Sequence, residues 1–352
     1  MLIASKDNQT IKEIKKLKES KYRKEKFIVE GFKMLQEAVN EGADIEIVVV
    51  KTGNKELLEN VNKLLGRLSQ NNELGNELIG GLSQNREAKN EPMKNQERKN
   101  ELLVYKHGKR LPRIIEVTEN VFMQLTDVKT PQGVLAVIRK NIEDNVSDFE
   151  DENENKNENE NENENKNENE NENENKNKND ALKDDVNSRK IDCLNKINTG
   201  ADYILAVDGV QDPGNLGTII RTADSANLKQ ILVSKDTVDA YSPKVIRSTM
   251  GSIYRVKIVE CENLADVLNE LKKHKFQIVS TSLDTENSIY DIDYRKKVVV
   301  IGNEGNGVSK EIQDLSDYKV KIPMLGKTES LNASVATGIM IYEYVRQMCS
   351  KK

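Results

Sequence analysis

An alternation of Asn with Glu or Lys, running from residue 151 to 179, limits what this 352-residue chain can fold into more than any other feature. Its period of two matches a β-strand, but the segment contains no apolar side chain that a sheet could bury. Since apolar burial cannot offset the entropy of ordering it, we predict a disordered linker over residues 141–195. The chain then divides into two folding units, 1–140 and 196–352. Neutral repeat expansion explains this composition most simply, and a solvated tether or an interaction tail is the alternative.

Charge is distributed unevenly between the linker and the rest of the chain. The chain has a net charge of −5, but residues 141–190 hold 18 acidic and 7 basic side chains, which leaves 41 acidic and 47 basic ones in the remainder. The first 27 residues alone contain nine Lys or Arg against four acids. A mildly basic folded part is compatible with a phosphate-rich partner such as nucleic acid but does not require one.

The composition also disfavours several classes of protein. No apolar run approaches the ~18 residues of a membrane span, and the first ten residues lack the apolar centre of a secretory signal. Three scattered cysteines (Cys193, Cys261 and Cys349) have no metal-type spacing and leave an odd thiol, so we expect neither a disulfide framework nor a zinc site. With only His107 and His274, a Ser-His-Asp triad or a histidine-metal site is poorly supported. We therefore expect a soluble cytoplasmic protein without metal or membrane contact.

The first unit alternates short apolar runs with helical patterns, as small α/β domains do. We predict strands at Phe27–Gly31, Ile45–Val50, Ile114–Val117 and Gly133–Ile138, and helices at Phe32–Val39 and Val121–Asp127. The pattern breaks down between about 66 and 100, where GRLSQN is echoed by GGLSQN. We interpret that stretch as a low-complexity insertion in a surface loop.

The second unit alternates more strongly and predicts an α/β domain with a mostly parallel sheet. Its strand-like runs are Tyr203–Val207, Gln230–Val233, Val256–Val259, Phe276–Ser280, Val298–Ile301 and Val320–Ile322. In open parallel sheets, ligands bind beyond the C-terminal ends of the strands. Three loops expected at that edge have unusual sequences.

The first loop lies within Asp208–Asn227 and leads into a helix that we expect to begin near Leu216. Asn215 stands between two glycines just before it. Arg221 points about 150° away from the centre of the helix's apolar stripe at ~100° per residue. A solvated surface charge and a functional arginine are both compatible with that position.

The second loop lies within Val298–Ile312, where a buried strand runs into the pattern G-x-x-G-x-G beginning at Gly302. The order differs from the dinucleotide fingerprint, and no Gly-Lys-Ser/Thr follows, which excludes a nucleotide-triphosphate loop. Glu304 inside the loop is either a turn stabiliser or a ligand contact. Ser309 is expected to cap the next helix.

The third loop leads from the last strand into an apolar helix, all within Val320–Met348. Ser330 or Asn332 is expected to cap this helix. The helix has one apolar face for the core and a second formed by Val335, Ile339 and Tyr342, so it needs another element to pack against. Any chemistry in this domain must use Arg, Asn, Ser, Glu and backbone groups, which suits the positioning of a reactive cofactor.

These three loops resemble the three motifs of the SpoU (TrmH) branch of the SPOUT RNA methyltransferases. The matching segments are NLGTIIR (215–221), VVIGNEGNGVS (299–309) and VKIPMLGKTESLNASVATGIMIYE (320–343), and SPKVIRSTMGS (242–252) resembles the segment between the first two motifs. The first unit is similar to the family's small α/β RNA-substrate-binding domain through FIVEGFKMLQEAV (27–39) and VFMQLTDVKTPQGVLAVI (121–138). Asn227 stands where the family often has Gly.

The resemblance implies a fold and a reaction. The fold is a Rossmann-like parallel sheet whose C-terminal segment forms a deep trefoil knot, in a homodimer. The reaction is in-line methyl transfer from S-adenosylmethionine to a ribose 2′-hydroxyl of structured RNA. By resemblance, the catalytic residues are Arg221, Asn215, Glu304, Ser330 and Asn332, and the cofactor pocket is lined by Gly302, Ile322, Leu331 and Thr281. Because arginine is a poor proton acceptor, we assign Arg221 to phosphate anchoring and alkoxide stabilisation, with solvent or a neighbour taking the proton.

Three functions remain open on the sequence. The separate RNA-binding domain favours ribosomal RNA, most simply of the large subunit, as the substrate. A transfer RNA, or the ribosomal loop whose methylation gives thiostrepton-type resistance, is the second possibility. A non-catalytic RNA-binding or ribosome-assembly factor is the third, and the intact set of polar residues disfavours it.

Overall fold

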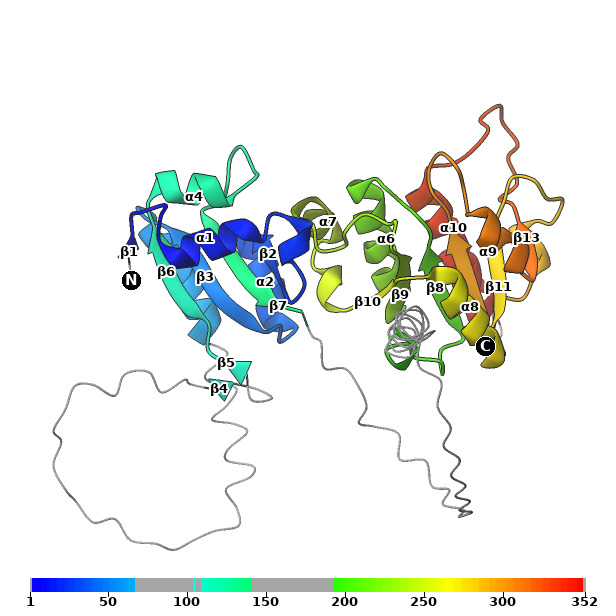
Figure 1. The fold of residues 1–352 in the computed structure, drawn as a ribbon, viewed down its shortest axis with the longest axis horizontal. Coiled ribbons are helices and arrows are strands. Elements are labelled where there is room, and N and C mark those ends of the chain that lie inside the picture. The colour runs from blue at the N-terminus through cyan, green and yellow to red at the C-terminus, as the bar shows by residue number, and fades with distance from the viewer. Residues whose placement is uncertain (1, 67–103, 106–108, 141–192, 351–352) are drawn as a thin grey trace, which may run out of the picture.

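The computed structural model describes residues 2–66, 104–105, 109–140 and 193–350, which form two α/β domains side by side (Figure 1). Most of the predicted insertion at 66–100 and of the predicted linker at 141–195 lies outside the described residues, as does His107. Only residues 193–195 of that linker are described, and they form a helical turn.

The N-terminal domain has a five-stranded sheet in the order β1-β6-β3-β7-β2. Strands β1, β3 and β6 are parallel to one another, and β7 runs antiparallel to both β2 and β3. The strands are β1 (Leu2–Ile3), β2 (Lys26–Glu30), β3 (Ile45–Lys51), β6 (Arg113–Val117) and β7 (Val134–Arg139). The four predicted strands are confirmed, each within a residue of its expected start. A separate two-stranded ladder joins β4 (Val104–Tyr105) to β5 (Lys109–Arg110).

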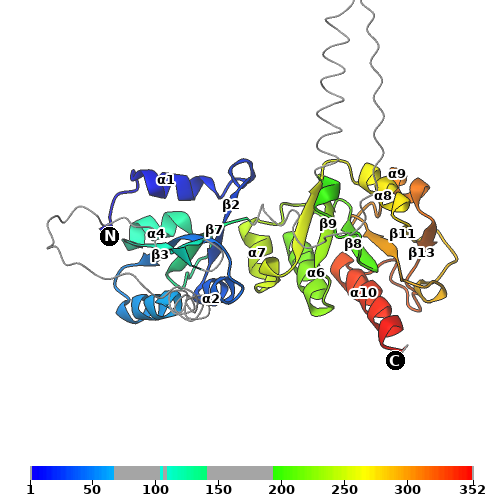
Figure 2. The same cartoon turned by 90° about the horizontal axis from the view of Figure 1, so that it is seen from below.

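Helices cover both faces of this sheet (Figure 2). Helices α1 (Gln9–Lys16) and α4 (Glu119–Leu125) pack on one face through Ile11, Ile14 and Phe122. Helix α2 (Phe32–Asn40) and a helical run at 55–66 pack on the other through Leu35 and Leu64. Successive side chains of a strand point to opposite faces, so Val48 and Val50 reach one core while Ile47 and Val49 reach the other.

The C-terminal domain has six parallel strands in the order β10-β9-β8-β12-β11-β13. The strands are β8 (Tyr203–Val207), β9 (Gln230–Ser234), β10 (Lys257–Cys261), β11 (Gln277–Thr281), β12 (Lys297–Ile301) and β13 (Tyr318–Val320). All six predicted strands are confirmed. The last one begins and ends two residues earlier than predicted, because Lys321 pairs with Ser288 in an isolated bridge instead of extending the strand.

Four of the described helices sandwich this sheet. Helices α6 (Pro213–Ser225) and α10 (Ala333–Cys349) pack on one face, and α8 (Leu264–Lys273) and α9 (Lys310–Leu315) on the other (Figure 2). Helix α7 (Pro243–Thr249) packs against α6 and against β2 of the N-terminal domain. Single-turn 3₁₀ helices lie at Ser20–Tyr22, Ser252–Tyr254 and Ile289–Asp291. The central strands β8 and β12 are buried on both faces, which is why all their residues except Lys297 are apolar or aromatic. No described helix is long and apolar enough to cross a membrane.

Two local features of this domain depend on backbone shape. Gly217 lies where α6 crosses α7, and a Cβ there would come within 2.3 Å of the Ser248 Cβ atom. Asn227, which ends the turn after α6, has a φ of 61°, the left-handed region that glycine favours and asparagine tolerates. Asn227 therefore adopts the backbone conformation that this turn requires, and α6 before it is not disturbed.

Candidate active site at the C-terminal edge of the sheet

The loops that follow β8 and β12 are tied together because the two strands are neighbours. The Asn303 side-chain amide donates to the Gly209 carbonyl at 2.7 Å, and the Ser309 backbone N–H donates to the Asp208 carboxylate at 2.8 Å. Asp212 accepts from the Asn215 N–H at 2.9 Å and caps α6, with Pro213 as the first helical residue. The helix therefore begins at Pro213, three residues before the predicted start, because that cap and proline fix its first turn.

A chain of hydrogen bonds joins all three predicted loops. The Asn332 side-chain amide donates to the Asn215 side-chain oxygen at 2.9 Å, and the Asn215 amide donates to the Glu304 carboxylate, also at 2.9 Å. These residues come from the ends of three strands and are up to 117 positions apart. We call Asn215, Glu304 and Asn332 the polar triad. Its three members were all predicted as site residues, and the structure brings them together.

Glu304 is the acceptor at the end of the triad. Its carboxylate also accepts from the backbone N–H groups of Gln211 and Asp212, each at 3.2 Å. Partial desolvation would raise the pKa of Glu304, but the hydrogen bonds from Asn215 and these backbone groups outweigh it and lower the pKa below its usual range. Glu304 is therefore an anion at neutral pH that holds the first and second loops together.

Backbone hydrogen bonds close the second loop into a tight turn directly after Gly302. Asn303 and Gly307 exchange two backbone hydrogen bonds of 2.9 Å. A Cβ on Gly302 would lie 2.0 Å from the Gly307 carbonyl carbon, so only glycine fits there. Ser309 precedes α9 as predicted but makes no side-chain capping bond.

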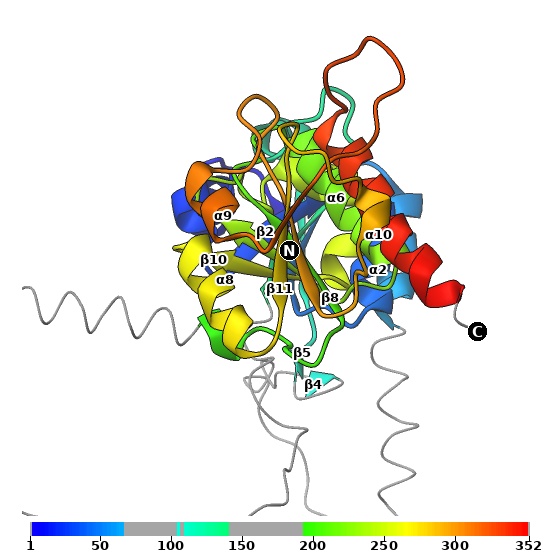
Figure 3. The same cartoon turned by 90° about the vertical axis from the view of Figure 1, so that its right-hand side faces the viewer.

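Asn332 has two roles, since its side-chain oxygen accepts from the N–H groups of Ser334 and Val335 and caps α10. The prediction that Ser330 or Asn332 caps this helix is confirmed for Asn332. Ser330 is exposed, and no hydrogen bond joins it to another described residue. The loop that holds it, 321–332, projects above α6 and α10, and Leu325 on it is fully exposed (Figure 3).

Arg221 lies outside the triad. It is the ninth of the thirteen residues of α6, further along the helix than a start near Leu216 would place it, because α6 begins at Pro213. It points away from the core as predicted, is exposed, and has no ion pair or hydrogen bond with any described residue. At ~100° per residue, its side chain leaves the helix about 120° from that of Asn215.

The predicted cofactor residues line the same edge of the sheet. Thr281 ends β11, and its hydroxyl donates to the Val300 carbonyl at 3.2 Å. Ile322 and Leu331 are half-buried in the loop between β13 and α10, and Gly302 is buried after β12. Among the described residues, no cluster of His, Cys, Asp and Glu could hold a metal ion.

Four contributors to the site went unpredicted. They are Asp208, Gln211, Asp212 and Asn303, which fix the loops rather than face a ligand. For Asp212 a local signal existed, since Asp-Pro before an apolar stripe is a typical helix start. The others act through contacts between distant loops, which leave no pattern in the sequence.

Comparison with known proteins agrees with this geometry. Residues 202–342 match the model of the SpoU rRNA Methylase family, and residues 8–91 match that of the MRM3-like substrate binding domain. The 23S rRNA (guanosine(2553)-2′-O)-methyltransferase RlmP of Bacillus subtilis is 37% identical over 140 residues, which is 40% of this chain and 56% of that protein. A TrmH family relative in Staphylococcus haemolyticus is 35% identical over 153 residues, 43% of this chain. The chain spans 61% of that relative's length.

Solved structures extend the likeness to the whole fold. The AdoMet-bound rRNA methyltransferase of Sinorhizobium meliloti superposes with a TM-score of 0.65 at 24% identity, covering 99% of this chain and 98% of that one. The SpoU methyltransferase AviRb of Streptomyces viridochromogenes gives 0.59 at 20% identity, covering 98% and 99%. At these identities the likeness to the solved structures shows the fold. The sequence matches show that the chain contains an MRM3-like substrate-binding domain at residues 8–91 and a SpoU methylase domain at residues 202–342.

Proposed function

We propose that this protein transfers a methyl group from S-adenosylmethionine to a ribose 2′-hydroxyl of RNA, with large-subunit ribosomal RNA as the substrate. The observation that carries the proposal is the polar triad, which joins the three family motifs at the sheet edge where ligands bind. The B. subtilis relative named as a 23S rRNA 2′-O-methyltransferase supports the choice of substrate.

The residues present fit the adenosyl cofactor. Ile322 and Leu331 offer half-buried apolar surface, and Gly302 offers backbone without a side chain. The Thr281 hydroxyl, which already donates to Val300, can still accept a hydrogen bond. When bound, S-adenosylmethionine supplies an electrophilic methyl group on its sulfonium.

The chain's own residues position the RNA and stabilise charge. Arg221 is exposed and without a described partner, so its guanidinium is available to hold a phosphate through two parallel hydrogen bonds. In our assignment it also stabilises the negative charge that develops on the ribose oxygen, and solvent or a neighbouring group takes the proton. The triad fixes the loops around the ribose, and the Ser330 hydroxyl is free to bind it.

We also propose a trefoil knot around the third loop. The connection between β11 and β12 lies against the C-terminal segment at two places. Lys321 donates from its backbone N–H to Asn287, while Gln347 on α10 accepts from the Tyr294 N–H and donates to the Ile292 carbonyl. A crystal structure would test the knot. If its backbone trace contains no segment that passes through a loop of the chain, the knot is refuted.

A homodimer, formed through the outer face of α10, completes the proposal. Val335 and Tyr342 on that face are 51% and 49% exposed, with the half-buried Ile339 between them. Tyr342→Asp should halve the mass measured by sedimentation equilibrium, and a monomeric parent protein would contradict the dimer. Ribosomal RNA as substrate implies a cytoplasmic location, which fluorescence microscopy of a tagged protein would test.

Mapping of ribose methylation tests the main proposal. Ribosomal and transfer RNA from cells with and without the gene should differ at one 2′-O-methyl site in large-subunit ribosomal RNA. A difference in transfer RNA instead would identify transfer RNA as the substrate. No difference in either RNA would refute the enzymatic function. Calorimetric binding of S-adenosylmethionine distinguishes an enzyme from a non-catalytic RNA-binding factor.

A further inference from the structure

The covalent connection between the two domains is long, since 52 residues separate Lys140 from Cys193. A chain of that length could reach on the order of 180 Å when extended, so it does not by itself fix where the substrate-binding domain sits. Non-covalent contacts must do so. The described residues provide two clusters of charged contacts between the domains.

The first cluster surrounds Arg23, which is only 5% exposed although it belongs to the N-terminal domain. Its guanidinium donates to the Asp239 carboxylate of the methylase domain at 2.7 and 2.8 Å. Ser20 donates to the same oxygen, and the Tyr241 N–H donates to the other. Two further bonds to the Leu17 and Lys18 carbonyls hold the arginine in place.

The second cluster surrounds Arg255 of the methylase domain. Its guanidinium donates to Glu37 on α2 of the other domain at 3.1 Å and to Glu41, which directly follows α2, at 3.0 Å. It also donates to Asp224 of its own domain at 2.9 Å. Burial would lower the pKa of Arg255, but the three carboxylates outweigh it and raise the pKa, so the arginine stays charged.

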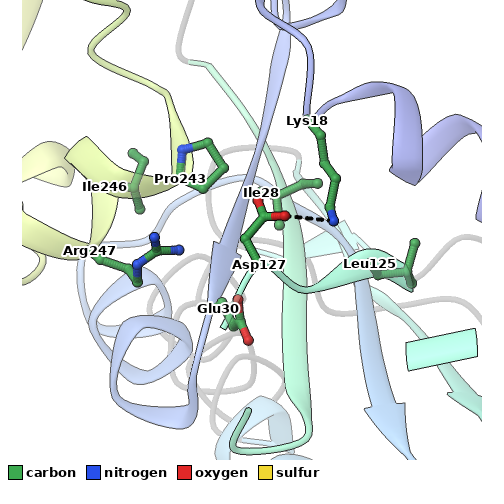
Figure 4. A pocket seen from close by; sticks show the side chains of 8 residues that line it. All are labelled: Lys18, Ile28, Glu30, Leu125, Asp127, Pro243, Ile246 and Arg247. Atoms are coloured by element: carbon green, nitrogen blue, oxygen red, sulfur yellow. Dashed lines mark hydrogen bonds and ion pairs between the residues drawn. The ribbon is translucent and has the colours of Figure 1, made fainter. Parts of the chain in front are cut away.

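Packing between the clusters is close on one side and open on the other. Phe27 and Tyr241 pack across the interface as a tilted pair with ring centroids 5.0 Å apart, and the Lys140 ammonium lies 3.9 Å from the Tyr241 ring centre. On the side that includes Lys18, Asp127 and Arg247, a cavity of about 10 Å³ lies between the domains, no more than one water needs (Figure 4). At the opposite side, a cavity of about 990 Å³ separates the domains and is lined by Glu41, Lys229 and Tyr254, among others.

Apolar packing therefore covers only part of the interface. The two arginine clusters supply most of its directional contacts, and an ion pair between Lys140 and Glu260 at 3.7 Å and a bond from the Tyr254 hydroxyl to the Met34 carbonyl at 3.4 Å add to them. Resting on the proposed function, we propose that Arg23 and Arg255 are positioning residues that hold the substrate-binding domain at a fixed place beside the methylase domain. A single RNA can then contact both domains only if the distance between its two contact points matches the fixed distance between the domains. The arrangement thus selects the target by the spacing between a bound RNA element and the methylated ribose.

The test removes only the contacts between domains. Glu37→Gln/Glu41→Gln removes both carboxylates that the N-terminal domain offers to Arg255, and Asp224→Asn is the control that removes only the contact within one domain. Dyes on the exposed Cys349 and on an introduced Leu2→Cys report the interdomain distance by energy transfer, since Cys193 and Cys261 are buried. The distance distribution should broaden in the double variant and in Asp239→Asn, and stay narrow in the control.

Methylation kinetics provide the second readout. If the docked arrangement is the binding-competent one, the KM for full-length RNA should rise about 10-fold in the double variant because fewer molecules are docked, with kcat within about 2-fold. The affinity for S-adenosylmethionine should not change, and Arg255→Lys should lower the KM again relative to Arg255→Ala.

Three results would overturn the proposal: an unchanged distance distribution, an unchanged KM despite undocking, or a parallel loss of cofactor affinity. The third would mean that the substitutions damage the methylase domain itself. If the parent protein methylates no RNA, the proposed function fails, and the distance measurement still decides whether these clusters hold the domains.

Discussion

The candidate active site contains two groups of residues that differ in how many hydrogen bonds they make within the protein. In the polar triad, Asn215, Glu304 and Asn332 are joined to one another and to backbone groups, with no ligand needed. Arg221 and Ser330 are exposed and have no partner among the described residues. The protein therefore fixes its loops in advance, whereas the two side chains that we propose bind RNA have no hydrogen bonds of their own within the described part of the chain. Substitutions in the first group should affect stability and activity together, and those in the second activity alone.

The largest effect is expected at Arg221. Arg221→Ala should lower kcat/KM by about 10²–10³-fold, the usual cost of losing a donor to developing charge. The thermal unfolding midpoint should not move, because the side chain is exposed and contacts no partner. Arg221→Lys keeps the charge without the planar fork and should recover only part of the activity. Near-full activity in the lysine variant would argue against bidentate anchoring.

Substitution of Gly302 tests whether the second loop is fixed before any ligand binds. Gly302→Ala should lower the free energy of unfolding by about 1–3 kcal/mol and weaken cofactor binding, because its methyl group would overlap the Gly307 backbone. Gly305→Ala is the control in the same loop, since its Cβ would meet nothing closer than 3.5 Å. Chemical denaturation of both variants measures the difference. Equal stability would mean that the loop rearranges freely and that the second motif is not prebuilt.

Asn332 separates the two roles that a member of the triad can have. Asn332→Ala should cost about 0.5–2 kcal/mol of stability through the lost helix cap, and activity should fall as well. Asn332→Asp keeps the capping oxygen but cannot donate to Asn215, so we expect it to retain the stability and lose the activity. Denaturation and methyl-transfer assays on both variants distinguish the cap from the triad. An active aspartate variant would show that the bond to Asn215 is dispensable.

Sequence patterns predicted the secondary structure of this protein better than its contacts. The five-residue strands of the methylase domain have apolar residues at their centres because helices cover both faces of the sheet, and that signal is local and strong. The members of the triad were predicted as residues of one site, but the hydrogen bonds between them were not, since Asn215 and Asn332 are 117 positions apart and only the strand order brings them together. The same reason explains why Asp239 went unpredicted as the partner of Arg23.

Errors arose where one local interaction replaced another. The cap at Asp212 places the start of α6 earlier than predicted and so changes the position of Arg221 along the helix.

Cys193 and Cys261, which look scattered in the sequence, lie with their sulfur atoms 3.6 Å apart in the methylase core. Their spacing of 68 residues carries no metal or disulfide pattern, so only the fold reveals that they are neighbours.

The smallest expected effect is the dependence of the triad on pH. Because the hydrogen bonds to Glu304 lower its pKa in the folded state, they stabilise the protein fully above the ordinary glutamate pKa of about 4.3. That stabilisation is lost as the pH falls through the lower folded-state value. Glu304→Gln should therefore unfold at a lower temperature than the parent at pH 7, and the gap should close on acidification. Glu311→Gln, at an exposed carboxylate on α9, controls for loss of a charge. A gap that does not narrow as the pH falls below about 4.3 would mean that Glu304 contributes through its shape rather than its charge, and the triad would then resemble an ordinary amide network.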